Sequence, residues 1–217
     1  MTDCCSPKGY QWIFSEGNAR TEARRYRRKG LDGTSRRIVD FLRAQGVEGR
    51  TLLEVGGGIG AIQLELLKAG AARAVSIELT PTYEKVAREL LDEAGLGDRV
   101  ERKVMDFAAA AAEVEAADVV VLNRVICCYP DMPRLAGAAA EHARQVLVLS
   151  YPRKVWWMAA ALTLANLMFR LTRREFHVFL HPPRQILATS EGHGLRAMLD
   201  DRGALWTVAA LRRTSAA

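Results

Sequence analysis

Residues 52–60, with the sequence LLEVGGGIG, place a short apolar run directly before a cluster of four glycines. The apolar run predicts a buried strand at 51–55, and a helix is predicted to begin at Ala61. Glycine permits positive φ and lets a ligand approach the backbone, and the first N–H groups of a helix are free to bind one. This feature restricts the chain to α/β folds in which a strand-to-helix turn can hold a ligand, with a turn that binds nothing as the simpler alternative.

The other apolar segments alternate with helices, which predicts a parallel sheet covered on both faces. Further strands are predicted at 74–78, 100–104, 118–122 and 145–149, separated by helices at 61–69, 81–94 and 133–143. A helix at 184–191 then precedes an antiparallel hairpin with strands at 195–199 and 205–211. Before the sheet, residues 1–17 are predicted to be irregular, and helices are predicted at 18–29 and 35–45, the second capped by Thr34 or Ser35. We expect a Rossmann-like, doubly wound α/β sheet of seven strands with the last strand antiparallel.

Acidic side chains follow two of the predicted strands. Glu78 ends the second strand, where a carboxylate can accept hydrogen bonds from both hydroxyls of a ribose. Asp106 and Phe107 end the third strand, where an acid beside an aromatic ring could bind an adenine. A solvated strand end explains Glu78 equally well, and a helix N-cap with a core phenylalanine is compatible with the second pair. The glycines also fit G-x-G-x-x-[GA] with Ala61 last, so a nucleotide-dependent oxidoreductase is an alternative, as is a non-catalytic cofactor-binding protein.

Together these features resemble the class I S-adenosylmethionine-dependent methyltransferases, over residues 34–152 and the hairpin at 195–211. In that family the glycine turn holds the amino acid end of the cofactor, the second-strand acid holds the ribose and the third-strand acid holds the adenine. The resemblance implies S-adenosylmethionine as cofactor and methyl transfer to a small-molecule acceptor. The cofactor-binding residues that it implies are Glu54, Gly56, Gly58, Gly60, Glu78, Leu79, Asp106, Phe107 and Asn123.

The stretch after the fourth strand bears on the acceptor. Nucleic-acid amino-methyltransferases of this class carry Asn/Asp-Pro-Pro-aromatic here, whereas this chain has Asn123 without the two prolines. Tyr129-Pro130 is more similar to magnesium-protoporphyrin O-methyltransferases, as are the apolar segment after the fifth strand and the early basic helix. We therefore expect no nucleic-acid partner and an apolar or anionic small molecule as acceptor.

The composition favours one domain of 217 residues, since 49% are hydrophobic and 26% are charged. We divide it into a basic N-terminal arm at 1–33, a cofactor-binding core at 34–152, an apolar insert at 153–183, and a C-terminal helix and hairpin at 184–217. Residues 1–50 hold 11 Lys/Arg against 6 Asp/Glu, and the rest hold 20 against 19, so the positive charge belongs to the arm. We expect a cytoplasmic protein, because no signal peptide or membrane span is predicted.

The four cysteines form two adjacent pairs, Cys4-Cys5 and Cys127-Cys128. The two pairs could meet and bind a soft metal or metalloid, which would make the chain a metalloid or thiol S-methyltransferase. We favour structural or incidental cysteines and expect no metal, because zinc sites usually separate their cysteines by two to four residues.

Three side chains are candidates for catalysis. His177 and His181 are four residues apart and would share a face if their segment were a strand, so one of them could act as a general base. Tyr129 follows the fourth strand, at the end of the sheet where α/β proteins bind their ligands. His142 is expected to be solvated in a helix, and His193 to lie in a turn.

Two further segments have more than one interpretation. The uncharged run at 155–169 could roof an apolar acceptor pocket, pack in a homodimer, or rest on a membrane with Trp156 and Trp157 at the headgroups. We expect the roof, because the run follows the fifth strand on the ligand side of the sheet. The basic helix at 18–29 is either a solvated cap or an arm that folds over the cofactor and contacts an anionic acceptor.

Overall fold

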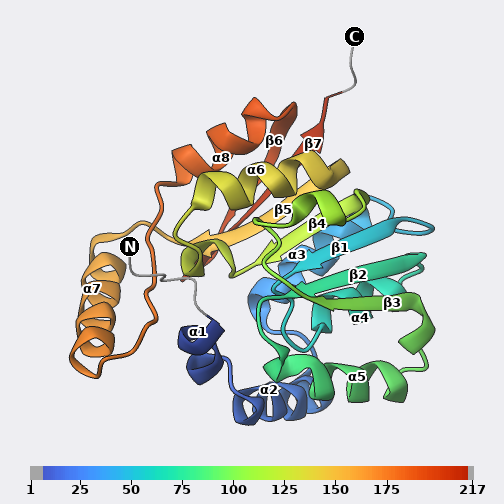
Figure 1. The fold of residues 1–217 in the computed structure, drawn as a ribbon. Coiled ribbons are helices and arrows are strands. Elements are labelled where there is room, and N and C mark those ends of the chain that lie inside the picture. Colours follow the sequence, from blue (N-terminus) through green and yellow to red (C-terminus); the bar gives the residue numbers. More distant parts are fainter. Residues whose placement is uncertain (1–6, 215–217) are drawn as a thin grey trace.

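The computed structural model describes residues 7–214 and contains a seven-stranded sheet between two layers of helices (Figure 1). The strands are β1 (Thr51–Val55), β2 (Arg73–Glu78), β3 (Val100–Val104), β4 (Ala117–Asn123), β5 (Ala143–Pro152), β6 (Leu195–Arg202) and β7 (Trp206–Arg213). Their order is β3-β2-β1-β4-β5-β7-β6. Strands β1 to β5 pair in parallel, and β7 is antiparallel to both β5 and β6. The predicted fold class, with its antiparallel last strand, is confirmed.

Helices follow the strands along the chain. They are α1 (Pro7–Ile13), α2 (Glu16–Lys29), α3 (Gly33–Ala44), α4 (Ala61–Lys68), α5 (Glu84–Glu93), α6 (Met132–His142), α7 (Trp156–Leu171) and α8 (Pro183–Gly192). Short 3-10 turns lie at Pro81–Tyr83, Gly97–Arg99, Ala111–Glu113 and Ile126–Cys128. Helices α6 and α8 lie on one face of the sheet and α3 and α4 on the other (Figure 1).

Strand β4 shows how the sheet joins the two halves of the core. Val119 and Val121 pack with side chains of α3 and α4, whereas Val120 and Leu122 pack with side chains of α6 on the opposite face. All four are at most 1% exposed. Successive side chains of a strand point to opposite faces, so a strand buried on both faces needs an unbroken apolar run. This requirement explains why the run at 118–122 predicted a central strand correctly.

The N-terminal arm differs from expectation. Residues 7–13 form α1, where irregular structure was predicted, because Tyr10 and the nearby Phe14 pack against Phe176 from the far end of the chain. In α2, Ala19 and Ala23 are fully buried among side chains that include Tyr83. Helix α3 is capped by Asp32 and not by Thr34 or Ser35, because the Asp32 carboxylate accepts from both of their backbone N–H groups.

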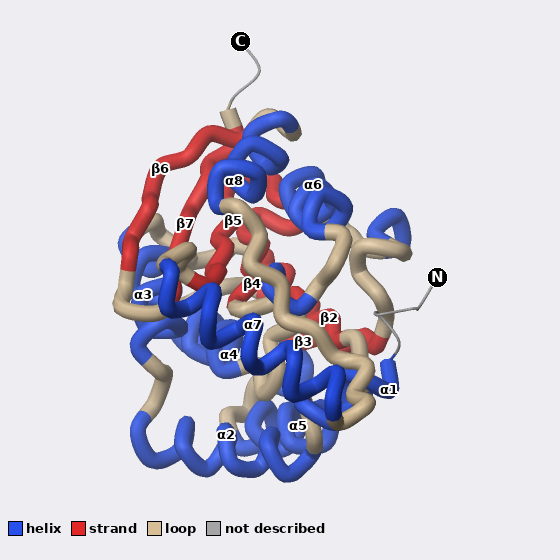
Figure 2. Tube along the Cα trace, turned by 90° about the vertical axis from the view of Figure 1, so that its left-hand side faces the viewer, coloured by secondary structure: helices blue, strands red, loops and turns tan. Residues whose placement is uncertain are grey.

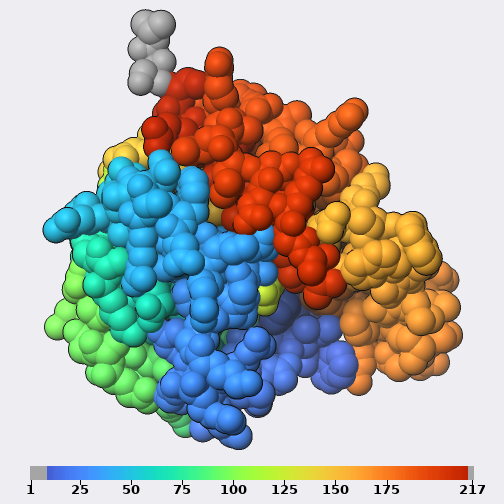
Figure 3. All heavy atoms as spheres, turned by 180° about the vertical axis from the view of Figure 1, so that it is seen from behind, coloured from blue at the N-terminus to red at the C-terminus, as the bar shows by residue number. Residues whose placement is uncertain are grey.

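Helix α7 lies outside both helical layers, beyond the end of β5 (Figure 1), and crosses the front of the molecule in Figure 2. It protrudes from the edge of the body in the space-filling view (Figure 3). None of its 16 residues is buried. Across residues 7–214, no helix combines the length and apolar character that crossing a membrane requires.

Candidate cofactor and acceptor site

A cavity of about 340 Å³ opens at the carboxyl ends of β1 to β4. This is the position where open α/β sheets bind ligands, and the volume lies within the range of small-ligand sites. Its floor comes from the turn after β1 and from the ends of β2, β3 and β4. Its other walls come from the N-terminal arm and include Tyr10, Phe14, Glu22, Arg25 and Tyr26. The arm therefore closes over the glycine turn.

The glycine turn brings the chain close to other parts of the cavity. Gly56 and Gly58 have φ of 66° and 60°, which side-chain-bearing residues rarely adopt. A Cβ on Gly56 would lie 2.5 Å from a methyl group of Val125, and one on Gly58 would lie 3.3 Å from the Tyr83 ring. The turn thus has no room for side chains, and the cavity reaches its backbone.

Glu78 is held against this turn. The backbone N–H of Gly58 donates to Glu78 Oε1 at 2.5 Å, and Arg102 Nη2 donates to the carbonyl of Gly58 at 3.3 Å. Burial raises the pKa of Glu78 to about 7, although Arg102 and the Gly58 N–H act in the opposite direction. A carboxylate with this pKa is stabilised when a ligand donates hydrogen bonds to it.

Glu54 and Gln63 are buried beside the turn, and each has side-chain atoms without a hydrogen-bond partner. Within residues 7–214, Glu54 Oε2 and both amide atoms of Gln63 have no hydrogen-bond partner. Burial, followed by repulsion from Glu78, raises the pKa of Glu54 to about 7. Buried polar atoms without partners are rare in folded proteins, since each costs about 1–3 kcal/mol. Because Glu54 lines the cavity, its orphaned oxygen fits a cationic or hydrogen-bond-donating ligand.

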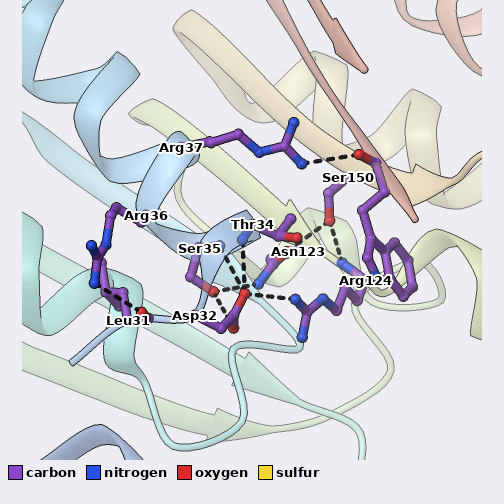
Figure 4. Close-up of polar contacts among 10 residues, drawn as sticks. Leu31, Asp32, Thr34, Ser35, Arg36, Arg37, Asn123, Arg124 and Ser150 are labelled. Atoms are coloured by element: carbon purple, nitrogen blue, oxygen red, sulfur yellow. Dashed lines mark hydrogen bonds and ion pairs between the residues drawn. The ribbon is translucent and has the colours of Figure 1, made fainter. Parts of the chain in front are cut away.

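A polar network links the N-cap of α3 to the ends of β4 and β5 (Figure 4). Arg124 Nη2 lies 2.6 Å from Asp32 Oδ1, and the Arg124 backbone N–H donates to Ser150 Oγ at 2.8 Å. Ser150 Oγ donates to Asn123 Oδ1 at 2.7 Å, and Asn123 Nδ2 donates to Ser35 Oγ at 3.2 Å. Burial alone would raise the pKa of Asp32, but Arg124 and the Ser35 and Thr34 N–H groups hold it below its ordinary value. The network fixes Asn123 and Arg124 at the cavity wall.

Arg124 is the residue in this network with the most unusual backbone. Its φ is 61°, in the left-handed region that non-glycine residues rarely occupy. Its guanidinium carbon lies 5.2 Å from the centre of the Trp206 ring, and its Nε is buried without a partner within residues 7–214. A strained residue that lines a cavity and carries a fixed positive charge is a candidate for binding an anionic group.

Asp106 and Tyr129 meet on the opposite wall. The Tyr129 hydroxyl lies 3.1 Å from each carboxylate oxygen of Asp106, and Asp106 Oδ1 also accepts from the backbone N–H of Ala109 at 3.2 Å. Asp106 therefore caps the turn that follows β3, and no helix begins there as the N-cap interpretation expected. Phe107 is 3% exposed and its ring packs against His142, with the ring centres 5.3 Å apart.

A family model described as a methyltransferase domain matches residues 23–203, which is most of the chain. The chain belongs to the methyltransferase domain family. This membership confirms the prediction of a methyltransferase domain with S-adenosylmethionine as its cofactor.

Curated relatives of this methyltransferase include ribosomal protein L11 methyltransferases. The one from Enterobacter sp. (strain 638) is 30% identical over 94 residues, which are 43% of this chain and 31% of that protein. The one from Pectobacterium atrosepticum is 27% identical over 112 residues, which are 50% of this chain and 38% of that protein. The chain thus spans only about a third of the length of these relatives.

Solved structures share the fold of the methyltransferase over most of its length. Magnesium protoporphyrin IX methyltransferase from Synechocystis PCC 6803, with bound SAH, aligns with a TM-score of 0.71 and 18% identity over 89% of this chain and 95% of that one. An O-methyltransferase family protein from Burkholderia thailandensis aligns with a TM-score of 0.69 and 24% identity, over 84% of this chain and 57% of that one. At these identities the likeness shows the fold alone.

Most residues that the sequence singled out gather at the cavity. Those that line it are Glu54, Gly56, Gly58, Glu78, Leu79, Asp106, Phe107, Asn123 and Tyr129. Gly60 does not line it and instead precedes α4 in a left-handed conformation. The residues that sequence reasoning missed are Tyr10, Phe14, Glu22, Asp32, Ser35, Tyr83 and Arg124. Arg124 could have been found, because it directly follows a strand end.

The predicted histidine pair does not reach the cavity. The condition under which His177 and His181 would share a face is not met, because residues 174–182 form a loop and not a strand. The Phe179 N–H of this loop donates to the Cys127 carbonyl in the 3-10 turn Ile126–Cys128. His177 is exposed and contacts Asn166, and His181 Nε2 lies 3.0 Å from the Tyr129 carbonyl. The cavity therefore gives no support to a base at either histidine. His142 is also not a solvated residue, since its ring nitrogens contact carbonyls of Ala111 and Ala138.

Two other expectations concern the cysteines and the apolar segment. Cys127 is buried, Cys128 lines the cavity, and their sulfur atoms are 3.7 Å apart, whereas Cys4 and Cys5 lie outside the described residues. Within residues 7–214, no group of three or more His, Cys, Asp or Glu side chains could hold a metal ion. The expected roof at 155–169 is wrong, because none of the described residues lining the cavity comes from 153–183.

Proposed function

We propose that the methyltransferase transfers a methyl group from S-adenosylmethionine to a small-molecule acceptor that carries an anionic group. The observation that carries this proposal is the enclosure of the cavity. Tyr10, Phe14 and Arg25 of the N-terminal arm line the same cavity as the glycine turn, so the chain's own arm occupies the side from which an acceptor would approach. Arg25 and Arg124 place positive charges on the cavity wall, and Arg124 is held there by Asp32 and the Trp206 ring.

We assign cofactor binding to the residues that line the floor of the cavity. Because Gly56 and Gly58 carry no side chains, the amino acid end of the cofactor could lie against their backbone. Gly60 would set the start of α4 beside it. The orphaned Glu54 oxygen would accept from the ammonium group of that end, and Glu78 would accept from the ribose hydroxyls. Asp106, with Leu79 and Phe107, would hold the adenine side, and Asn123 would contact the cofactor from the opposite wall.

When bound, S-adenosylmethionine would supply an electrophilic methyl group for in-line attack by an acceptor lone pair, and its positively charged sulfur would leave as a neutral thioether. The contribution of the protein is to position the acceptor and to exclude water, since proximity and orientation can supply much of the rate enhancement. Of the three predicted catalytic side chains, Tyr129 alone lines the cavity, and its hydroxyl is oriented by Asp106. Tyr129 is therefore our candidate for contacting the acceptor, and a proton on the acceptor atom would leave through water or through that hydroxyl.

Transfer of a labelled methyl group from S-adenosylmethionine into a cell extract tests the proposal. We expect label in the low-molecular-mass fraction, and we expect Gly58→Val to abolish it. Label confined to the protein fraction would instead indicate a protein acceptor. The relatives named ribosomal protein L11 methyltransferases make this the alternative to test. Separate titrations with S-adenosylhomocysteine and NAD distinguish a methyltransferase from a nucleotide-dependent oxidoreductase.

A further inference from the structure

Helix α7 presents a continuous apolar face to the solvent. Exposed side chains recur at the spacing of one helix face and comprise Trp156, Trp157, Leu164, Leu167, Met168 and Leu171. Their exposed fractions run from 41% for Trp157 to 83% for Trp156. A surface helix normally turns its polar side outward, so this arrangement is reversed. Exposed apolar patches of this kind mark an interaction surface.

The opposite side of α7 is held by specific contacts. Asn166 Nδ2 donates to the Val178 carbonyl at 2.8 Å, and the Val178 N–H donates to Asn166 Oδ1 at 2.9 Å. The ring of Phe169 packs edge-on against buried Phe176, with the ring centres 5.6 Å apart. The one amide side chain of the helix therefore faces the protein, and the apolar side chains face outward.

The charged residues of α7 and of the segments that flank it are cationic up to Arg174, and the first acidic residue after the helix is the exposed Glu175. Residues 142–174 contain no Asp or Glu, and they contain Arg144, Arg153, Lys154, Arg170, Arg173 and Arg174. Lys154 at the start of the helix and Arg170 and Arg173 at its end are exposed. Arg174 stacks on Trp12 of α1, which is itself 52% exposed. Cations thus flank the apolar face at both ends.

This charge pattern disfavours a second copy of the chain as the partner. If two α7 helices packed in parallel, each cationic end would face the same cationic end of its partner. If they packed antiparallel, Arg170 and Arg173 of one copy would face Lys154 of the other. The nearest acidic residue after the helix, Glu175, is outnumbered by Arg170, Arg173 and Arg174 beside it, and like charges at an interface cost stability.

We propose that α7 docks on an anionic lipid bilayer. Its apolar face would lie in the plane of the interface, with Trp156 and Trp157 at headgroup depth and the flanking cations against lipid phosphates. The 16-residue helix is only about 24 Å long, short of the ~30 Å hydrocarbon core, so it would lie on the bilayer and not cross it. This docking goes beyond the proposed methyl transfer and would place the cavity near the membrane, because Phe176 joins α7 to the cavity residues Tyr10 and Phe14.

Flotation of the full chain with lipid vesicles tests the proposal. We expect binding to vesicles of phosphatidylcholine mixed with phosphatidylglycerol, weaker binding to phosphatidylcholine alone, and release by salt. Each cation near an anionic surface contributes about five-fold in affinity, so Lys154→Glu with Arg170→Glu should weaken binding by at least about 25-fold. The triple change Trp156→Ser, Leu164→Ser and Leu171→Ser should abolish it. All five positions are exposed, so these variants should retain the thermal stability of the native chain.

Control variants change exposed residues on other elements. Arg88→Glu with Arg196→Glu alters charge on α5 and β6, and Val104→Ser with Met198→Ser removes apolar surface from β3 and β6. Both should bind the mixed vesicles like the native chain. The proposal is overturned if the native chain binds neither kind of vesicle, if the α7 variants bind as well as the controls, or if those variants merely convert a dimer to a monomer. The assay uses no acceptor, so its failure would leave the proposed methyl transfer untouched.

Discussion

The backbone N–H of Gly58 donates a hydrogen bond of 2.5 Å to Oε1 of Glu78, although the two residues are 20 positions apart in the sequence. This bond ties the turn after β1 to the end of the neighbouring strand β2. Because Glu78 also lines the cavity, the turn positions a carboxylate that a ligand can reach. The two strongest sequence features of the chain are therefore parts of one site.

Glu78 should make cofactor binding depend on pH. Hydroxyl donors favour an ionised carboxylate, so a bound ribose lowers the pKa of Glu78 from about 7 and binding releases a proton. The affinity for S-adenosylhomocysteine should therefore rise as the pH increases through about 7. Glu78→Gln should weaken binding by about 1.5–3 kcal/mol above that pH and reduce the pH dependence. Calorimetry measures both effects, with the exposed Glu115→Gln as control. An unchanged affinity in Glu78→Gln would contradict the ribose assignment.

Gly58→Val should abolish cofactor binding while the fold persists. The new side chain would start 3.3 Å from the Tyr83 ring and would extend into the cavity from a backbone with φ of 60°. Gly95→Val is a matched control, because Gly95 has φ of 65° and open space around its Cβ position. Both variants should lose similar stability, measured by thermal unfolding, and only Gly58→Val should lose S-adenosylhomocysteine binding. Equal binding by the two variants would count against the cofactor site.

The sheet was predictable because its central strands are buried on both faces. Runs such as 118–122 must then be apolar throughout, and glycines mark the turns that follow. The sequence did not predict α1, because that short helix is stabilised by ring contacts of Tyr10 and Phe14 with Phe176, more than 150 residues away. The spacing of His177 and His181 would have mattered only in a strand, but their segment pairs with no strand of the sheet and contacts α7 through Asn166 instead.

The candidate site was predictable where backbone geometry defines it and unpredictable where tertiary packing does. Gly56, Gly58 and Glu78 follow from the strand-turn-helix pattern. Glu22 was hidden in a strongly basic helix, and its proximity to the turn depends on the burial of Ala19 and Ala23. The apolar character of 155–169 was evident, but nothing in the residues themselves indicated that the apolar side would face solvent.

Asp32→Ala should destabilise the protein more than an equivalent change at another helix start. Asp32 accepts from two backbone N–H groups of α3 and pairs with Arg124, whereas Asp131 accepts from a single N–H group of α6. Loss of an N-cap costs about 0.5–2 kcal/mol. We expect Asp32→Ala to lie at the upper end of that range and Asp131→Ala at the lower end in urea denaturation. The opposite order would show that the Asp32 network contributes little to stability.

Replacing Cys127 and Cys128 by alanine, together with Cys4 and Cys5 by serine, should leave cofactor affinity unchanged. Cys127 is buried as a small apolar residue, and within residues 7–214 the two thiols contact each other and the Arg124 carbonyl. We expect a small loss of stability from the lost packing volume. Calorimetry with S-adenosylhomocysteine and metal analysis of the native chain check this. Stoichiometric metal in the native chain, or arsenite methylation that the variant lacks, would support the thiol alternative.

Glu54 should make the stability of the unliganded protein fall as the pH rises. Its pKa is about 7 in the folded chain, against an ordinary value of 4.5, because burial and Glu78 disfavour the charged form. The folded state therefore binds more protons than the unfolded state between these two values, so the free energy of unfolding decreases from about pH 4.5 to about pH 7. Glu54→Gln removes this titration and should increase stability above pH 7 by roughly 2–3 kcal/mol. Urea denaturation at several pH values measures the difference, and Glu115→Gln should leave the profile unchanged because Glu115 is exposed. The same variant should weaken S-adenosylhomocysteine binding, since the orphaned oxygen of Glu54 is the proposed acceptor for the ammonium group. A Glu54→Gln protein that is no more stable than the native chain at high pH would contradict the destabilising burial of the Glu54 carboxylate at this turn.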